Sequence, residues 1–315
     1  MSQTHEARLR RELSETEEKL LKMGIAGVAC AGTSTFLNPV DVTKIKMQVG
    51  GKGRTLIAEM RAIVENEGLR GLTRGIEPSV GRELVYGTIR IGGYESIRNL
   101  VAAAASGGAQ GGEDNQNTSP FVKYGSALLS GAIGSAIANP FDLVKTRFQA
   151  AVVKKGESGT GYPYRNTLQA FSYIIKNEGG FKGLYKGVSP TIARAALVTS
   201  SQLGTYDTVK NNILKARFGM KEGYSLHCAS AFVAGIAITI ASNPADVVKS
   251  RYLADSSSEV GKRRYNGVMD CMREVWKERA LYRGATAAYS RFAPHTFLSL
   301  LAVEKIRQLL GLDGI

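Results

Sequence analysis

One short pattern recurs three times along this chain of 315 residues and constrains its architecture more than any other feature. The copies read PVDVTKIK from Pro39, PFDLVKTR from Pro140 and PADVVKSR from Pro244, so the proline advances by 101 and then by 104 residues. Each copy ends a long uncharged stretch and places an acid and a base after a helix-kinking proline. A repeat of this period predicts three copies of one structural unit.

The uncharged stretches are long enough to predict membrane-spanning helices. Residues 23–40, 124–141 and 223–245 contain no Asp, Glu, Lys or Arg and are rich in Gly, Ala and Ser, which let membrane helices approach closely. A bilayer core needs about 20 largely apolar residues in a helix. The hydrophobic fraction of 43% and the mean hydropathy of −0.10 would also fit a soluble protein, so the alternative is a buried helix of a soluble enzyme.

The charge balance limits the partners. The formal net charge of +14 suits nucleic acid, acidic lipid or anionic solutes, but Lys and Arg are spread through all three units, which disfavours nucleic acid.

Cys30, Cys228 and Cys271 fit neither a metal site nor a disulfide framework. Residues 1–22 carry five acids and five bases, which argues against a signal or transit peptide. Any organelle address is therefore expected within the mature chain.

Each unit reads as a long helix, a basic connector, a short amphipathic helix and a second long helix. The predicted helices are 22–48, 55–66 and 76–101, then 120–149, 166–177 and 188–215, then 224–253, 267–278 and 285–310. The corresponding divisions are an N-terminal extension 1–21, repeats 22–101, 120–215 and 224–310, and a flexible loop 102–119. Two spans per unit make the three units parallel about one axis, with both termini facing one compartment.

These features resemble the mitochondrial carrier family over essentially the whole chain. Further family marks are NEG at 66–68 before LTRG at 72–75, and NEG at 177–179 before LYKG at 184–187. In the third unit ERA at 278–280 runs directly into LYRG at 281–284, so this corner lacks the glycine and is expected to be tighter. The resemblance implies an all-α membrane protein with six transmembrane helices, which transports solutes as a monomer in the mitochondrial inner membrane, both termini toward the intermembrane space.

The acids and bases of the triplicate motif are candidates for a gate. Taken alone, an Asp and a Lys three residues apart form a local helix pair of a few tenths of a kcal/mol. The resemblance instead implies a matrix-side ring between repeats, braced by Gln48 and Gln149, with Leu253 at the third brace position. The implied pairs are Asp41 with Lys145, Asp142 with Lys249, and Asp246 with Lys44.

A second charged set near the ends of the even-numbered long helices is implied to form the opposite, cytoplasmic gate. The implied pairs are Glu95 with Lys210, Asp207 with Arg307, and Glu304 with Arg98. Two gates at the ends of one pathway are what alternating access requires, and they argue against a permanently open channel.

Between the two gates, several cations mark a candidate cargo site. Arg82, Tyr86 and Arg90 lie at i, i+4 and i+8 on one helix face, while Arg194 and Arg291, with His295 one turn later, come from two further helices. Charges at membrane depth are costly and should face water or a partner. Guanidinium groups bind carboxylate or sulfate with two hydrogen bonds, so a small dianion is the expected cargo. The alternative is that each Arg pairs with an acid or extends to headgroups; Glu83 is the one acid expected nearby.

Subfamily features resemble the oxoglutarate, dicarboxylate and uncoupling-protein branch. They are RxxxYGTxRxG from Arg82, ARA at 193–195 and RFAPHT at 291–296, and the PHT element favours the oxoglutarate and dicarboxylate side. The run of three Arg and three Met that marks adenine-nucleotide carriers is absent. Glu83 departs from the glutamine expected at its position, so we expect it to neutralise Arg82 and to alter the choice of solute.

The basic corners of the repeats resemble cardiolipin-binding segments of the same family, where helix N-termini and a base hold phosphate. The alternative is an ordinary helix-capping turn. The candidate lipid-binding residues are Arg74, Gly75, Lys186, Gly187, Gly267, Arg283 and Gly284.

Three functions stay open on the sequence alone. The first is exchange of small dianions, such as malate and oxoglutarate or sulfate and phosphate. The second is fatty-acid-dependent proton transport of the uncoupling type, and the third is a membrane-attached nucleic-acid-binding or scaffold protein. An enzyme is the least expected, because no catalytic or metal-binding cluster accompanies these motifs, and no cofactor is expected.

Overall fold

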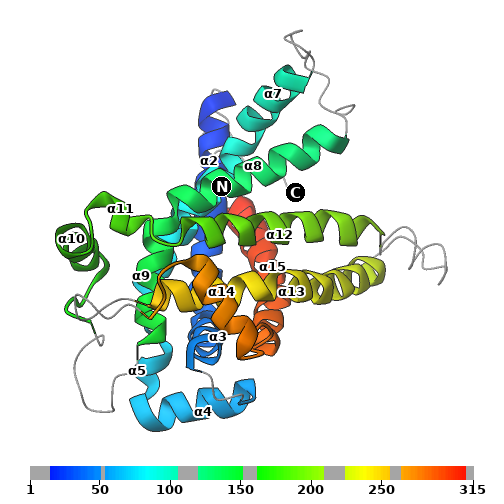
Figure 1. The fold of residues 1–315 in the computed structure, drawn as a ribbon. Coiled ribbons are helices and arrows are strands. Elements are labelled where there is room, and N and C mark those ends of the chain that lie inside the picture. The colour runs from blue at the N-terminus through cyan, green and yellow to red at the C-terminus, as the bar shows by residue number, and fades with distance from the viewer. Residues whose placement is uncertain are drawn as a thin grey trace, which may run out of the picture.

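The structure, a computed structural model, describes residues 15–50, 54–105, 120–151, 162–208, 224–255 and 264–309. Within these residues all regular elements are helices (Figure 1), and they repeat three times in the order long, short, long.

The first long helix is divided in two repeats, into α2 (Glu15–Phe36) and α3 (Asn38–Gly50) and into α8 (Pro120–Ile137) and α9 (Asn139–Ala150). In the third repeat it is the single helix α13 (Tyr224–Ala254). The short helices are α4 (Leu56–Glu67) with α5 (Leu69–Leu72), α10 (Thr167–Asn177) with α11 (Phe181–Leu184), and α14 (Val268–Lys277). The second long helices are α6 (Ile76–Gly87), η1 (Thr88–Gly92) and α7 (Gly93–Ala105), then α12 (Val188–Thr208) and α15 (Ala285–Leu309).

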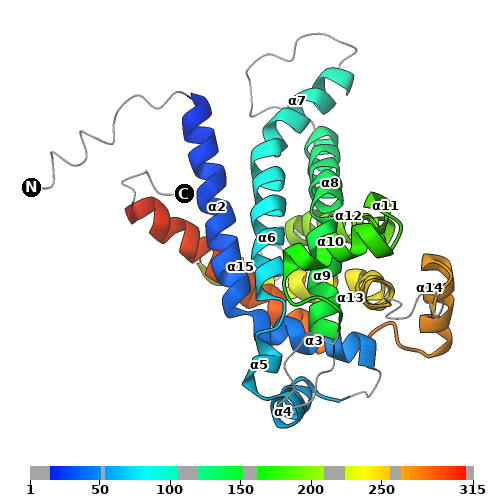
Figure 2. The same cartoon turned by 90° about the vertical axis from the view of Figure 1, so that its left-hand side faces the viewer.

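The long helices contact one another in chain order, and the last returns to the first. Helix α2 packs on α6, α7 on α8, α8 on α12, α12 on α13, and α13 on α15, which packs back on α2. Figures 1 and 2 show this arrangement from two sides, with the short helices at its periphery. The motif-bearing helices α3, α9 and α13 also contact one another, so the three copies of the motif meet at one end of the bundle.

The motif prolines have different effects on their helices. In the first two repeats the helix breaks just before the Asn that precedes Pro39 and Pro140, at Leu37 and Ala138, because a proline has no N–H for the helical ladder. The axes of α8 and α9 differ by 63°. In the third repeat α13 continues as a helix through Pro244. The second long helix of repeat one departs further from the prediction, because the π-helical turn η1, which contains Arg90, interrupts it.

The short helices are held at the periphery by caps and by small apolar cores. Thr55 Oγ1 accepts a bond from the backbone N–H of Ala58, and Asn166 Oδ1 accepts one from Gln169, so α4 and α10 begin with side-chain caps. The inner faces of α10 and α14 join clusters on the motif-bearing helices α9 and α13. One cluster includes Leu143, Val144, Phe148, Tyr164 and Ile174, and the other includes Val247, Val248, Tyr265, Cys271 and Val275. This packing fixes where the second and third motifs lie.

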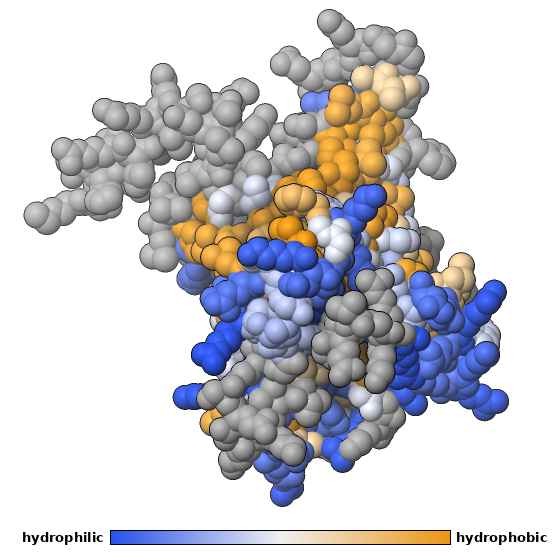
Figure 3. Space-filling view, turned by 60° about the vertical axis from the view of Figure 1, so that its left-hand side comes forward, coloured by the Kyte–Doolittle hydropathy of each residue, from blue (hydrophilic) through white to orange (hydrophobic). Residues whose placement is uncertain are grey.

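Hydropathy divides one face of the molecule. In Figure 3 hydrophobic side chains gather in the upper part and hydrophilic ones in the lower part. Helix α4 lies at the bottom of the molecule in the view of Figure 1, which has the same vertical axis. Within the described residues no single helix is both long and apolar enough to pass for a membrane span, whereas the bent pair Val122–Ile137 and Asn139–Ala150 passes when taken together.

Candidate functional site

The acids and bases of the three motifs form one closed ring of ion pairs. Lys44 Nζ lies 2.6 Å from Asp246 Oδ2, Lys145 Nζ lies 2.8 Å from Asp41 Oδ2, and Lys249 Nζ lies 2.9 Å from Asp142 Oδ2. All six side chains are buried. Each pair joins two different repeats, as the family resemblance implies, so the ring links all three repeats at this end of the bundle through contacts that no single repeat can make.

A second cation contacts each aspartate of the ring. Arg291 Nε lies 2.5 Å from Asp41 Oδ1, Arg82 Nε lies 2.7 Å from Asp142 Oδ1, and Arg194 Nε pairs with Asp246 Oδ1. Each aspartate therefore receives a lysine from one neighbouring repeat and an arginine from the other. The expectation that Glu83 is the one acid near these arginines is wrong, because each arginine contacts a ring aspartate of another repeat.

Tyr86 and Arg90 extend the site along the second long helix of repeat one. The Arg82 guanidinium carbon lies 4.9 Å from the centre of the Tyr86 ring, and that of Arg90 lies 5.8 Å from it. The tyrosine ring thus separates two arginines of one helix face, as their spacing predicted. Arg90 is exposed, and its carbonyl accepts a bond of 3.1 Å from Ser130. His295 lies half-buried on α15 and within electrostatic range of Glu83.

The two predicted brace residues bond beside the ring. Ser250 Oγ donates to Gln48 Oε1 at 2.7 Å, and Gln149 Nε2 donates to Asn38 Oδ1 at 3.1 Å. Their role as braces of the ion pairs stays a prediction. The side chain at each brace position also packs against a corner glycine of another repeat.

Each brace position lies under the corner glycine of the preceding repeat. A Cβ built at Gly75 would lie 3.0 Å from Gln149 Cγ, and one built at Gly284 would lie 3.1 Å from Gln48 Cγ. Gly187 would meet Leu253 in the same way. Because these three glycines have φ between +72° and +77°, they also adopt a backbone conformation that other residues rarely take. A glutamine and a leucine can therefore fill the same interface position.

Sequence reasoning missed the asparagine before each motif proline, although it recurs in all three copies. Asn38 Nδ2 donates to the carbonyls of Leu72 and Arg74 at 2.8 and 3.1 Å. Asn139 Nδ2 donates to those of Leu184 and Lys186 at 3.0 and 3.2 Å, and Asn243 Nδ2 to that of Leu281 at 2.7 Å. These buried amides tie the corner of each repeat to its motif. The signal was the dipeptide Asn-Pro.

The second base of each motif pairs with the glutamate that follows the short helix. Arg147 binds Glu178 with two bonds of 2.8 and 2.6 Å, and Arg251 Nη1 lies 2.7 Å from Glu278 Oε2. Lys46 pairs with Glu67 in the same way. In sequence these glutamates are only family marks, whereas in the structure each one links its short helix to the motif of the same repeat.

The predicted cytoplasmic gate lies almost wholly outside the described side chains. This is so for Glu95, Asp207, Lys210, Glu304 and Arg307. The sixth member, Arg98, is described, and its guanidinium carbon lies 6.0 Å from the centre of the Tyr94 ring.

The bases of the predicted lipid-binding corners have contacts within the protein. Arg74 Nη1 lies 2.9 Å from Glu67 and donates to the carbonyl of Ala151 in the next repeat at 3.3 Å. Lys186 Nζ donates to the carbonyl of Asp255 in the next repeat, and Arg283 Nη1 lies 3.5 Å from Glu278. Gly267 precedes α14 in extended backbone. These bases therefore link repeats or stabilise corners.

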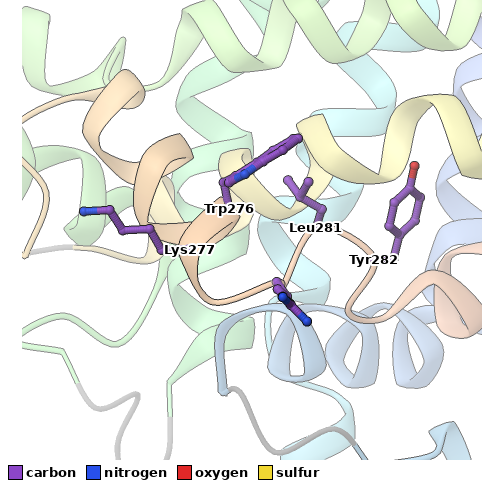
Figure 4. A pocket seen from close by; sticks show the side chains of 5 residues that line it. Trp276, Lys277, Leu281 and Tyr282 are labelled. Carbon is purple, nitrogen blue, oxygen red and sulfur yellow. The ribbon is translucent and has the colours of Figure 1, made fainter.

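The corner of the third repeat differs from the other two. The first two contain the four-residue helices α5 and α11, with Gly68, Gly179 and Gly180 at positive φ, whereas the third passes from α14 to α15 through turns. Arg279 takes the positive φ of +50° there. As expected from the missing residues, the corner is tighter. Figure 4 shows the pocket of about 450 Å³ beside it, lined by Trp276, Lys277, Leu281 and Tyr282 together with Arg279.

Below this corner, Cys271 is fully buried, and burial raises the pKa of its thiol to about 12. A thiol with this pKa is protonated and unreactive at neutral pH. No group of three or more His, Cys, Asp or Glu within the described part of the chain is arranged to hold a metal ion.

Comparison with known proteins agrees with this architecture. The family model described as mitochondrial carrier protein matches residues 16–104, 116–217 and 221–314, one match for each repeat. The chain is 34% identical over 305 residues to the mitochondrial substrate carrier family protein ucpB of Dictyostelium discoideum, covering 94% of this chain and 97% of that protein. It is 32% identical over 299 residues to mitochondrial uncoupling protein 1 of Arabidopsis thaliana, covering 90% of each chain.

It is also 31% identical over 315 residues to mitochondrial uncoupling protein 5 of Arabidopsis thaliana, with 91% of this chain and 95% of that protein covered. The three family matches coincide with the three repeats that meet at the charged ring. The chain therefore belongs to the mitochondrial carrier family, whose members are three-repeat, all-α solute transporters of the mitochondrial inner membrane.

Proposed function

We propose that the protein exchanges small dianions, dicarboxylates above all, across the mitochondrial inner membrane by alternating access between two charge gates. The observation that carries the proposal is the double partnership of each ring aspartate. Arg82, Arg194 and Arg291 come from three repeats, and each binds one oxygen of an aspartate whose other oxygen binds a gate lysine. The same three arginines are thus both the natural anion-binding groups and supports of the gate.

This arrangement suggests how cargo opens the gate. A dianion that enters the pathway offers its carboxylates to the arginines, and guanidinium groups bind carboxylates with two parallel bonds. An arginine that turns to the cargo releases its ring aspartate, which keeps only the lysine. The ion pairs that close the ring lose part of their support, so binding energy is used to open one gate only when cargo is present. Tyr86, Arg90 and His295 then line the approach to the bound anion.

The remaining assignments follow from this mechanism. When the ring opens, Glu95, Asp207 and Glu304 are expected to pair with Lys210, Arg307 and Arg98 and close the cytoplasmic side. The basic connectors favour the matrix for the ring end, which leaves both termini toward the intermembrane space. The basic corners also suit the phosphates of acidic lipids such as cardiolipin.

The test is the exchange activity of an Arg291 variant in proteoliposomes. We expect Arg291→Ala to abolish uptake of labelled malate against internal malate, because the pathway loses one of its three anion-binding arginines. Arg70→Ala, which removes an exposed arginine of α5, is the matched control and should exchange normally. Melting of both purified variants checks folding. Unchanged exchange by a folded Arg291→Ala protein would refute the site assignment.

A second candidate is fatty-acid-dependent proton transport, favoured by the relatives named uncoupling proteins. It predicts proton flux into liposomes when fatty acid is present, without any anion on the opposite side. Obligatory exchange predicts no proton flux beyond that of protein-free liposomes. Measuring both fluxes on one preparation separates the two functions.

A further inference from the structure

Glu83 is a buried acid with no counterpart in the other two repeats. Arg82 is followed by this glutamate, whereas Arg194 is followed by Ala195 and Arg291 by Phe292. Only 4% of Glu83 is exposed. A buried carboxylate is costly unless it is paired. The ion pairs of the Glu83 carboxylate therefore indicate what this buried charge does.

The carboxylate of Glu83 lies between arginines of two different repeats. Its Oε1 is 2.6 Å from Arg82 Nη1 and 3.9 Å from Arg291 Nη2. Both arginines use their Nε atoms for ring aspartates, at 2.7 Å from Asp142 and 2.5 Å from Asp41. Glu83 therefore occupies a position between two guanidinium groups that suits a carboxylate of a bound anion. It also links two arms of the threefold cluster, whereas the third arm, Arg194 with Asp246, has no equivalent acid next to it in sequence.

Glu83 changes the net charge of the linked cluster. The ring lysines and the three arginines supply six positive charges, and the ring aspartates with Glu83 supply four negative ones, so two positive charges remain. His295, neutral in this count, and Lys145 are within electrostatic range of Glu83, and Arg90 lies beyond Tyr86, outside the linked cluster. A neutral residue at position 83 would leave three positive charges.

The balance matters because charges in a poorly hydrated site must be compensated. A dianion neutralises the cluster as it stands. A trianion leaves one negative charge uncompensated, and the desolvation cost of an uncompensated buried charge is large. From this we infer that Glu83 sets the charge of the cargo, selecting dianions against anions of higher charge. The inference rests on the proposed function, since it concerns the same anion site.

The test compares two anions that differ by one carboxylate. Glutarate is a dianion at mildly alkaline pH, and tricarballylate is the same carbon chain with a third carboxylate. Full-length protein in detergent is titrated with each anion, and its thermal stabilisation gives an apparent affinity for both. For the wild type we expect glutarate to bind more tightly. For Glu83→Gln, which keeps the shape and removes the charge, we expect the ratio to shift toward tricarballylate by roughly tenfold or more.

Two further variants keep the result interpretable. Glu83→Asp retains the charge and should retain the preference for glutarate. Glu65→Gln removes the charge of a largely exposed acid on α4 and should leave the ratio unchanged. If wild type binds glutarate and Glu83→Gln shows the same ratio, the role of Glu83 is overturned while the proposed function stands. If neither anion stabilises wild type or Glu83→Gln, both are overturned.

Discussion

The charged ring and the corners are both built from triplicated sequence, yet the three repeats match closely at the ring and differ at the corners. At the ring every aspartate has one lysine and one arginine partner, from the two neighbouring repeats. At the corners two repeats use a four-residue helix and glycines, and the third uses turns and Arg279. The repeats are constrained most strictly where all three meet.

The difference has a physical cause. Loss of one ring aspartate would leave buried charges of the two other repeats uncompensated, so one substitution disturbs the whole cluster. The stretch that differs between the repeats lies just after the short helix, where the Asn before the proline and the glutamate at the end of the short helix tie it to its own repeat. A shorter corner can therefore be accommodated locally.

The largest expected effect comes from exchanging charges in the ring. Asp41→Asn should lower stability by about 3–5 kcal/mol, because Lys145 and Arg291 lose a shared buried partner. The swap of Asp41→Lys with Lys145→Asp should restore only part of it, because the new lysine faces Arg291. Adding Arg291→Gln to the swap should restore more. Melting in detergent measures all three, and full recovery by the simple swap would show that the arginines do not belong to the ring.

An intermediate effect is expected at the asparagines that hold the corners. Replacing one of the buried residues Asn38, Asn139 and Asn243 with Ala leaves the corner carbonyls without their donor, which costs about 1–3 kcal/mol each. Asn66→Ala removes an exposed amide that bonds only within its own helix, and it should cost less than 0.5 kcal/mol or so. Melting temperatures that fall no further for Asn139→Ala than for Asn66→Ala would contradict the role assigned to these residues.

The last comparison distinguishes the corners themselves and includes the smallest expected effect, the one at Arg279. Gly68 combines φ +75° with ψ −178°, a conformation that is essentially restricted to glycine, so Gly68→Ala should destabilise the protein by about 1–3 kcal/mol. Arg279 lies in the left-handed region, where a side chain costs roughly 1–2 kcal/mol, and Arg279→Gly recovers part of this against the greater freedom of the unfolded chain. We expect a gain of about 0.5 kcal/mol. Melting in detergent measures both variants. If Gly68→Ala and Arg279→Gly shifted the melting temperature by the same amount in the same direction, the proposed difference between the two corners would be contradicted.

Much of the architecture was predictable because each repeat carries its own signals. The recurring proline motif located the motif-bearing helices, and the partners of Asp41, Asp142 and Asp246 among the lysines followed from family resemblance. The helix boundaries lie close to the predicted ones, although α2 begins at Glu15, within the segment predicted as an N-terminal extension. The continuous helix through Pro244 was not distinguishable from its broken counterparts by sequence.

The part of the site that the sequence does not predict consists of contacts between repeats. The helix-face spacing of Arg82 and the depth of Arg194 and Arg291 predict anion-binding residues. No spacing along the chain indicates that each one reaches an aspartate of another repeat. The bridging position of Glu83 between two arginines depends on the same packing. The π-helical turn η1 was missed as well, because Thr88–Gly92 has no helix-breaking residue other than its terminal glycine.

The most direct test of the account is counter-exchange by the purified wild-type protein. Proteoliposomes are loaded with malate, oxoglutarate, sulfate, phosphate, ATP or no anion, and uptake of each labelled anion is followed. We expect saturable uptake of a dianion only when a dianion is present inside. Uptake that is independent of the internal anion, or proton flux with fatty acid in place of any exchange, would contradict it.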